Sequence, residues 1–159
     1  MLLAERAGSW PRRYEMSRDG QKLTTFTSGK GETKGSFRLG GTEYTVRAHA
    51  FSRTYELLTE AGTCVATAEH VGRRNWSVRA SGQESAFRRA SLSGRSQELL
   101  GADGEPVGSI ARTAGFKLGA TADLPGLADE LQVFATAVML LRWQRQRNSA
   151  AAGAAAASS

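Results

Sequence analysis

The sequence predicts a mainly β fold, a closed antiparallel β-barrel of about twelve strands around a central hydrophobic C-terminal α-helix. Up to residue 122 the chain is a succession of short runs in which apolar and polar residues alternate, divided by turn residues. The segment that follows contains a helix with apolar side chains on all sides, which must be buried on all sides. Closure hides the edges of so many strands, and the wide lumen that results needs such a helix to fill it.

The expected strands are short and are joined mainly by tight hairpins. Turn signals such as Asp19-Gly20, Gly40-Gly41 and Asp103-Gly104 mark where the chain reverses. No strand is expected before residue 14. Roughly eleven strands are expected, at residues 14–16, 22–27, 36–39, 43–48, 54–58, 63–70, 76–80, 85–92, 97–100, 107–112 and about 117–122.

The central helix is expected around the segment LQVFATAVMLLRW, from Leu131 to Trp143. Either a bilayer or a shell of protein could bury such a segment. Its thirteen residues reach roughly 20 Å, whereas a hydrocarbon core of about 30 Å needs about 20 apolar residues. Acidic residues precede the run, and Arg142, Arg145 and Arg147 close it. We therefore expect a shell of protein and no transmembrane span.

The chain of 159 residues is expected to form a single domain over residues 1–147, with the central helix at about 127–147. Residues 148–159 read NSAAAGAAAASS and have no large apolar side chain to bury, so we expect a disordered tail. The lone Cys64 cannot form an internal disulfide, and the first residues, MLLAERAGSW, do not resemble a secretory signal. These features favour a cytoplasmic protein.

The sequence gives little indication of catalysis. His49 and His70 are expected on strands, and no cysteine or carboxylate lies near either at the spacing of metal ligands. Cys64 is expected to be an inert thiol in a buried strand. No glycine-rich loop opens a helix after a strand, as a nucleotide site requires. We therefore expect no catalytic residue, no metal and no cofactor, and a protein that is not an enzyme.

Several segments resemble the tubby-like superfamily, and within it the small bacterial relatives of the LURP-one-related and phospholipid scramblase-like proteins. The resemblance is carried by the hairpins YELLTEAGTCVATAEH and QELLGADGEPVGSIAR, the segment Asp123-Leu124-Pro125 and the C-terminal LQVFATAVMLLRWQR, and it covers about residues 10–147. It implies a closed barrel of about twelve strands around a C-terminal helix. Tubby proteins bind phosphoinositide headgroups, and scramblase-like proteins are linked to membranes and calcium. No calcium loop, cluster of palmitoylatable cysteines or phosphoinositide motif can be matched, so no functional residue is carried over.

Charge gives the remaining clue to function. The net charge of +6 favours anionic partners, although the cations are dispersed along the sequence and could serve only solubility. Neighbouring strand residues point to opposite faces, so an arginine pair either lies in a turn, as expected for Arg73-Arg74, or sends one side chain toward the lumen or its mouth, as expected for Arg88-Arg89. The candidate binding residues are Arg73, Arg74, Arg88, Arg89, Arg145 and Arg147.

Two functions are compatible with these observations. The first is a non-catalytic binding module that recognises anionic phospholipid headgroups at the cytoplasmic membrane surface. The alternative is a cytoplasmic scaffold or regulatory protein that binds another, acidic protein without lipid. Nucleic acid is not favoured as a partner.

Overall fold

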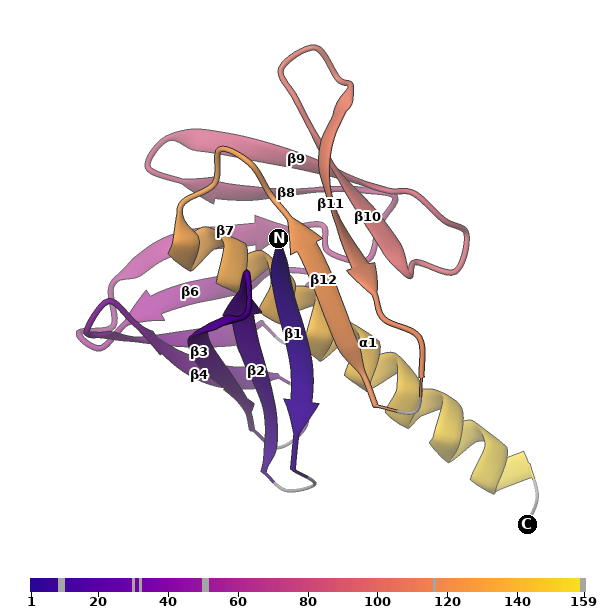
Figure 1. Cartoon of the computed structure of the whole chain (residues 1–159). Helices are drawn as coiled ribbons and strands as arrows, with labels where there is room; N and C mark the ends of the chain where they lie inside the picture. The colour runs from indigo at the N-terminus through magenta and orange to yellow at the C-terminus, as the bar shows by residue number, and fades with distance from the viewer. Residues whose placement is uncertain (9–10, 30, 32, 50–51, 116, 158–159) are drawn as a thin grey trace.

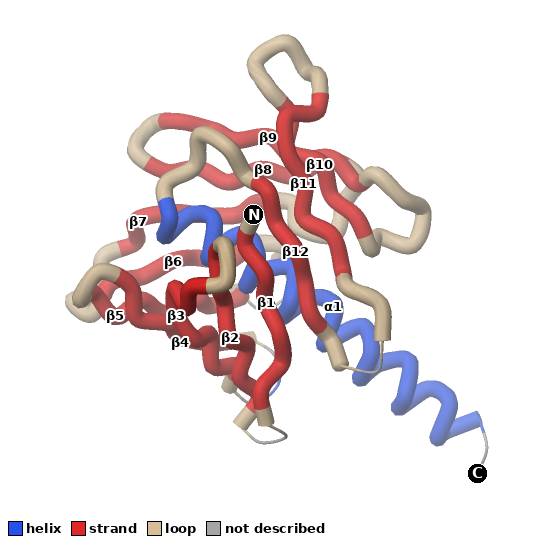
Figure 2. Tube along the Cα trace, in the orientation of Figure 1, coloured by secondary structure: helices blue, strands red, loops and turns tan. Residues whose placement is uncertain are grey.

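The computed structural model describes residues 1–8, 11–29, 31, 33–49, 52–115 and 117–157. Twelve antiparallel strands form a closed barrel in which each strand pairs with its neighbours in sequence and the first pairs with the last (Figures 1 and 2). The strands are β1 (Leu2–Ala7), β2 (Arg12–Arg18), β3 (Gln21–Ser28), β4 (Lys34–Leu39), β5 (Thr42–Ala48), β6 (Tyr55–Thr59), β7 (Cys64–Glu69), β8 (Asn75–Ala80), β9 (Gln83–Arg89), β10 (Ser96–Leu100), β11 (Pro106–Arg112) and β12 (Gly119–Asp123). The predicted fold class is confirmed.

The strand that the sequence analysis missed is the one that closes the barrel. β1 pairs with β2 on one side and with β12 on the other, in a register that places Leu2 opposite Ala122. Leu2 and Ala4 point into the core, while Glu5 is exposed. The alternation is short and one of its inward residues is only an alanine, so the periodic signal was weak.

The long helix α1 (Asp129–Ala157) runs through the barrel (Figure 1). Every residue from 133 to 141 is at most 2% exposed, which confirms that the segment is buried on all sides. The wall supplies large inward side chains from strands around the whole circumference, including Tyr14, Phe26, Phe37, Val46, Leu57, Phe87 and Ile110. Helix and wall therefore form one core, in which the helix replaces the empty lumen of a barrel of this size.

Polar contacts fix the helix at both ends of the lumen. At its start, the Arg18 guanidinium makes an ion pair of 3.0 Å with Asp129 and donates a hydrogen bond of 2.9 Å to Gln132. At the other end, the indole N–H of Trp143 donates to the Gly94 carbonyl at 2.9 Å. These contacts come from opposite ends of the barrel, so they set both the depth and the rotation of the helix.

The helix does not stop where the sequence analysis placed the end of the domain. It continues to Ala157, so the prediction of a disordered tail from residue 148 is wrong for the residues described. The reason is that alanine is the strongest helix former, and this run can extend an existing helix without a core of its own. Residues 149–157 are exposed, and Ser158 and Ser159 lie outside the described residues. Within the described chain, no helix is both long and apolar enough to cross a membrane.

Strands β3 and β4 pack closely at a glycine, Gly35. The pairing of β3 with β4 is short and joins Thr27 to Ser36 and Ser28 to Gly35. The ring of Phe26 lies directly against Gly35, at a place where any Cβ would overlap it. A larger residue at position 35 would therefore displace either the ring or the strand.

Because the strands alternate in direction, the loops collect at two ends of the barrel. We use the term entry end for the end at which α1 begins, and exit end for the end at which α1 leaves the lumen. The entry-end loops are residues 19–20, 40–41, 60–63, 81–82, 101–105 and 124–128. The exit-end loops, as far as the structure describes them, are residues 8, 11, 29, 31, 33, 49, 52–54, 70–74, 90–95, 113–115 and 117–118.

Candidate anion-binding site at the exit end of the barrel

The loops at the two ends of the barrel differ in charge. Among their described residues, the exit-end loops contain no carboxylate and carry the cations Arg53, Arg73, Arg74, Arg95 and Lys117. The entry-end loops contain no lysine or arginine and carry the acids Asp19, Glu60, Asp103 and Glu105. The helix follows the same division, since it begins with Asp129 and Glu130 and leaves the barrel at Arg142, Arg145 and Arg147. Within the described loops, cations that are far apart in the sequence therefore share the exit end, whereas Arg18, Arg38 and Arg79 lie on strands nearer the entry end.

A cavity of about 160 Å³ opens at the exit end, between the helix and two of the loops. It is lined by three arginines and two glutamines and by no carboxylate, and we refer to it as the arginine pocket. Its lining residues are Gly72, Arg73, Arg89, Leu92, Ser93, Gly94, Gln97, Met139, Arg142, Trp143 and Gln146. The volume is below the range of about 300–1,000 Å³ that is usual for drug-sized ligands. It suits a small anion or the terminal group of a larger ligand.

The strand β9 determines which arginine of its pair reaches the pocket. Phe87 is fully buried in the lumen, so Arg89, two residues further along the strand, lies on the same face at the mouth. Arg88 points to the outer wall, where its Nε and Nη2 donate to Glu98 at 3.2 and 2.8 Å. The expectation that one member of this pair faces the mouth is met by Arg89, whereas Arg88 is neutralised outside the pocket.

Arg142 enters the pocket from the helix, and a glycine makes room for it. The guanidinium lies against Gly72, where an added Cβ would overlap it. The φ angle of Gly72 is +90°, a conformation that residues with a side chain rarely adopt. Gln97 is held at the floor, where its side chain accepts a hydrogen bond from Trp76 at 2.8 Å and donates one to Gly94 at 3.1 Å.

The arginines of the pocket are surrounded by like charge. Burial lowers the pKa of Arg142, and Arg53, Arg145 and Arg89 lower it further, while Tyr55 acts in the opposite direction. An arginine nevertheless stays protonated at neutral pH. Among the described residues, Arg73, Arg89 and Arg142 take part in no ion pair with a carboxylate. The site is therefore an accumulation of positive charge that an anion would stabilise.

The arginines of the helix also act on a tyrosine of the barrel wall. Tyr55, at the start of β6, is almost fully buried, and burial raises the pKa of its hydroxyl. Arg142 and Arg145 partly offset that rise. On another part of the exit end, burial lowers the pKa of Arg112, with Arg147 and Arg95 as further causes. Cations thus lie close to one another outside the pocket as well, at Arg112, Arg147 and Arg95.

The other predicted binding residues lie at the exit end but outside the pocket. Arg74 is in the exposed turn with Arg73, as predicted, but does not line the cavity. Arg145 is exposed on the helix, and Arg147 is half-buried beside Arg112. The sequence analysis did not select Arg142 as a binding residue, although it is the only charged residue in the run from Leu131 to Trp143, which was a visible signal.

The cysteine and the histidines differ from their predicted positions. Cys64 is exposed at the start of β7, so the prediction of a buried core thiol is wrong. His49 and His70 lie just beyond the ends of β5 and β7 instead of within the strands. His49 contacts Glu56 at 2.5 Å, and hydrogen bonding from His49 is the main cause of the lowered pKa of Glu56. Over the described residues, no group of three or more potential metal ligands is found.

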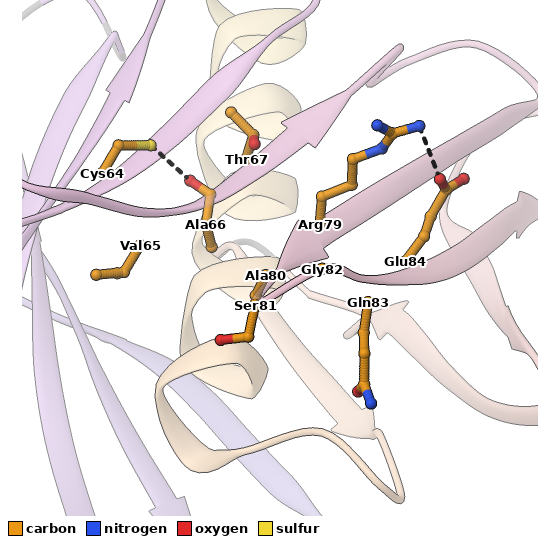
Figure 3. A pocket seen from close by; sticks show the side chains of 10 residues that line it. All are labelled: Cys64, Val65, Ala66, Thr67, Arg79, Ala80, Ser81, Gly82, Gln83 and Glu84. Atoms are coloured by element: carbon orange, nitrogen blue, oxygen red, sulfur yellow. Dashed lines mark hydrogen bonds and ion pairs between the residues drawn. The ribbon is translucent and has the colours of Figure 1, made fainter.

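A second, wider opening lies on the barrel wall toward the entry end, between β7 and β8 (Figure 3). These strands pair only from Thr67 to Glu69 with Ser77 to Arg79, and the first half of β7, from Cys64 to Ala66, extends past the end of this pairing. The resulting groove of about 440 Å³ is bordered by Cys64 on one side and by the ion pair of Arg79 with Glu84, at 2.9 Å, on the other. Its charges are paired, so it lacks the excess of cations seen in the arginine pocket.

The chain matches no protein-family model, and it has no significant match among curated proteins or among solved structures.

Proposed function

We propose that this protein is a non-catalytic, tubby-like module of the cytoplasm that binds anionic phospholipid headgroups at the membrane surface. The observation that carries the proposal is the difference in charge between the loops at the two ends of the barrel, with a cationic exit end. A cation near an anionic leaflet contributes about 1 kcal/mol of attraction, whereas acidic loops are repelled. The charge distribution therefore favours one orientation, with the exit end toward the membrane. The tubby-like assignment is supported by the sequence patterns described above.

Two features of the exit end suit such an orientation. Leu92 is 99% exposed in the loop 90–95, beside the arginine pocket, where it could enter the apolar edge of the headgroup layer. The helix leaves the barrel at the same end and extends about 15 Å beyond residue 147. A flat approach of the mouth would drive this extension into the bilayer, so we infer a tilted approach that brings the loops 70–74 and 90–95 to the surface.

Partitioning of the purified chain onto vesicles tests the proposal. Arg73→Ser/Arg74→Ser should weaken partitioning onto vesicles with anionic lipid by about tenfold to thirtyfold at physiological salt, since two surface cations contribute about 2 kcal/mol. The matched control is Arg38→Ser/Arg79→Ser, which removes the same charge from exposed positions nearer the entry end. A rise in salt concentration should weaken the partitioning of the wild-type protein onto anionic vesicles. If both double variants lose the same amount of vesicle partitioning, the effect depends only on net charge, and the proposed orientation is contradicted.

A second pair of residues locates the contact within the exit end. Arg145→Ser/Arg147→Ser removes two cations from the emerging helix, and in a tilted approach it should weaken partitioning less than the change at residues 73 and 74. If Arg145→Ser/Arg147→Ser weakens vesicle partitioning more than Arg73→Ser/Arg74→Ser does, the helix side of the mouth faces the membrane. If the wild type does not partition at low salt, the lipid proposal fails.

The alternative, a scaffold or regulatory protein that binds another protein, has its own supporting observation. The stretch of β7 from Cys64 to Ala66 has no partner on β8 beside the groove, and an exposed strand edge can pair with an added peptide strand. This alternative predicts that coupling a bulky maleimide to Cys64 blocks association with the partner protein. The same label should leave vesicle partitioning unchanged, because Cys64 lies away from the exit end.

A further inference from the structure

We propose that the arginine pocket is a specific binding site for the phosphate group of a phosphomonoester. The inference deepens the proposed function, which needs only diffuse charge, by assigning a discrete site and a ligand class. Arg73, Arg89 and Arg142 line one small cavity without a carboxylate. Guanidinium groups are planar forks of donors that match phosphate oxygens and bind them with charge-assisted hydrogen bonds.

The three arginines reach the pocket from three separate elements, which gives the site its shape. Arg73 comes from the turn after β7, Arg89 from the end of β9 and Arg142 from the helix. Each backbone is held in place by a strand, a helix or a hydrogen-bonded turn, since Arg73 N–H donates to His70 at 3.0 Å and Arg89 N–H to Arg74 at 2.7 Å. The fold therefore places the three backbones around the pocket before any ligand arrives, so an anion does not have to order the loops to bind.

Volume and charge select the ligand class. A cavity of about 160 Å³ holds several waters at about 30 Å³ each, and a phosphate group has a comparable number of heavy atoms. A phosphomonoester carries about −1.5 to −2 charges at neutral pH and three terminal oxygens, one for each arginine. A phosphodiester carries a single charge and two terminal oxygens, so it matches this site less well. The amide side chains of Gln97 and Gln146 add neutral polar groups to the lining.

The rim of the pocket also favours a ligand whose carbon skeleton lies outside the pocket while its phosphate group is inside. Leu92 is exposed at the rim, so the carbon skeleton that bears the phosphate would pass beside an apolar side chain. A lipid with a terminal phosphate and a soluble phosphorylated metabolite share this chemistry. The geometry selects the phosphate group, and the source is a separate question that experiment can answer.

The test compares two neighbouring arginines that lie on opposite faces of one strand. Arg89→Gln removes a pocket cation, whereas Arg88→Gln removes the same charge from the outer wall, where Arg88 pairs with Glu98. Binding of glycerol 3-phosphate to each purified protein is measured by calorimetry. Arg89→Gln should weaken binding by about tenfold or more, as expected for a lost charged hydrogen bond, while Arg88→Gln should change it less than about twofold. Arg73→Gln, in the exposed turn, provides a second pocket variant whose folding is not at risk.

Vesicles distinguish the two sources of phosphate. The wild type is compared on phosphatidylcholine vesicles that contain phosphatidic acid, a monoester, or phosphatidylglycerol, a diester, at matched surface charge. A preference for phosphatidic acid that Arg89→Gln removes identifies a lipid headgroup. Binding of glycerol 3-phosphate without that preference identifies a soluble phosphate and supports the pocket even if membrane binding fails. The pocket proposal is overturned if neither probe binds in an Arg89-dependent way, and partitioning onto phosphatidylglycerol would then leave the membrane function standing alone.

Discussion

Replacing Val138 by aspartate tests whether the helix is the core of the barrel. Val138 is 0% exposed at the middle of the buried segment of α1. Loss of the buried valine side chain costs about 1.5–3 kcal/mol. A carboxyl group in this apolar setting would be forced to bind a proton, which at pH 7 costs about 4 kcal/mol from an ordinary pKa of about 3.9. Its unmatched polar atoms add about 1–3 kcal/mol.

The combined loss of about 7–10 kcal/mol matches the whole stability of a typical domain, which is about 5–15 kcal/mol. Val138→Asp should therefore yield little soluble protein and no cooperative unfolding transition by circular dichroism at pH 7. The matched control is Ala150→Asp, which places the same charge on the exposed extension of the same helix. That control should melt within a few degrees of the wild type.

The dependence of Val138→Asp on pH gives a further check. The buried carboxyl would have a raised pKa, so it is protonated in the folded state. The free energy needed to protonate it falls as the pH approaches the pKa of the carboxyl in the unfolded chain, and is about 1.5 kcal/mol at about pH 5. Any folded fraction of the variant should increase on mild acidification. A soluble variant that unfolds cooperatively at pH 7, close to the wild-type midpoint, would refute the assignment of α1 to the interior of the barrel.

Three further predictions concern the wall, a surface pair and the helix extension. Gly35→Ala should lower the free energy of unfolding by about 1–3 kcal/mol in urea titrations, because the new Cβ overlaps the Phe26 ring; an unchanged midpoint would show that the ring moves freely. The pKa of Glu56 is lowered below its ordinary value of 4.5, chiefly by His49, so its contribution to stability is present above pH 4.5 and is lost as the pH falls through the lowered pKa. Urea midpoints measured across that acid range should therefore fall less for Glu56→Gln than for the wild type, and parallel curves would contradict the assignment. Truncation after Asn148 should leave the melting temperature within about 2 °C of the full chain, since the residues removed are exposed where described and bury little area; a larger drop would show that the extension packs on the barrel.

The fold could be predicted because its two main signals are periodic. The alternation in the strands and the apolar residues on all sides of the helix depend only on which residues must avoid water. The closing strand was missed because Leu2 and Ala4 give a short, weak alternation. The helical extension was missed because residues 148–157 have no large apolar side chain, which predicts disorder. An alanine run that continues a packed helix, however, can be helical without burying any side chain.

The candidate site was only partly predictable. The inward direction of Arg89 was implied by its spacing from Phe87, which is two residues earlier on the same strand. Its meeting with Arg73 and Arg142 depends on the register of the barrel and on the rotation of the helix inside it. A shift of one residue in the pairing of β9 would exchange the faces of Arg88 and Arg89 and remove the site. No local pattern in the sequence fixes that arrangement.

The position of the helix after all twelve strands has a consequence for synthesis of the protein. Ribosomes release a chain from its N-terminus at about 5–20 residues per second, so β1 must wait for its partner β12, and the apolar wall must wait for α1. Contacts between such distant parts of a chain form slowly, and the incomplete sheet exposes both apolar surface and unpaired edges. The nascent chain is therefore vulnerable until α1 emerges, and a ribosome stalled before residue 129 would present a product suited to chaperone binding or degradation.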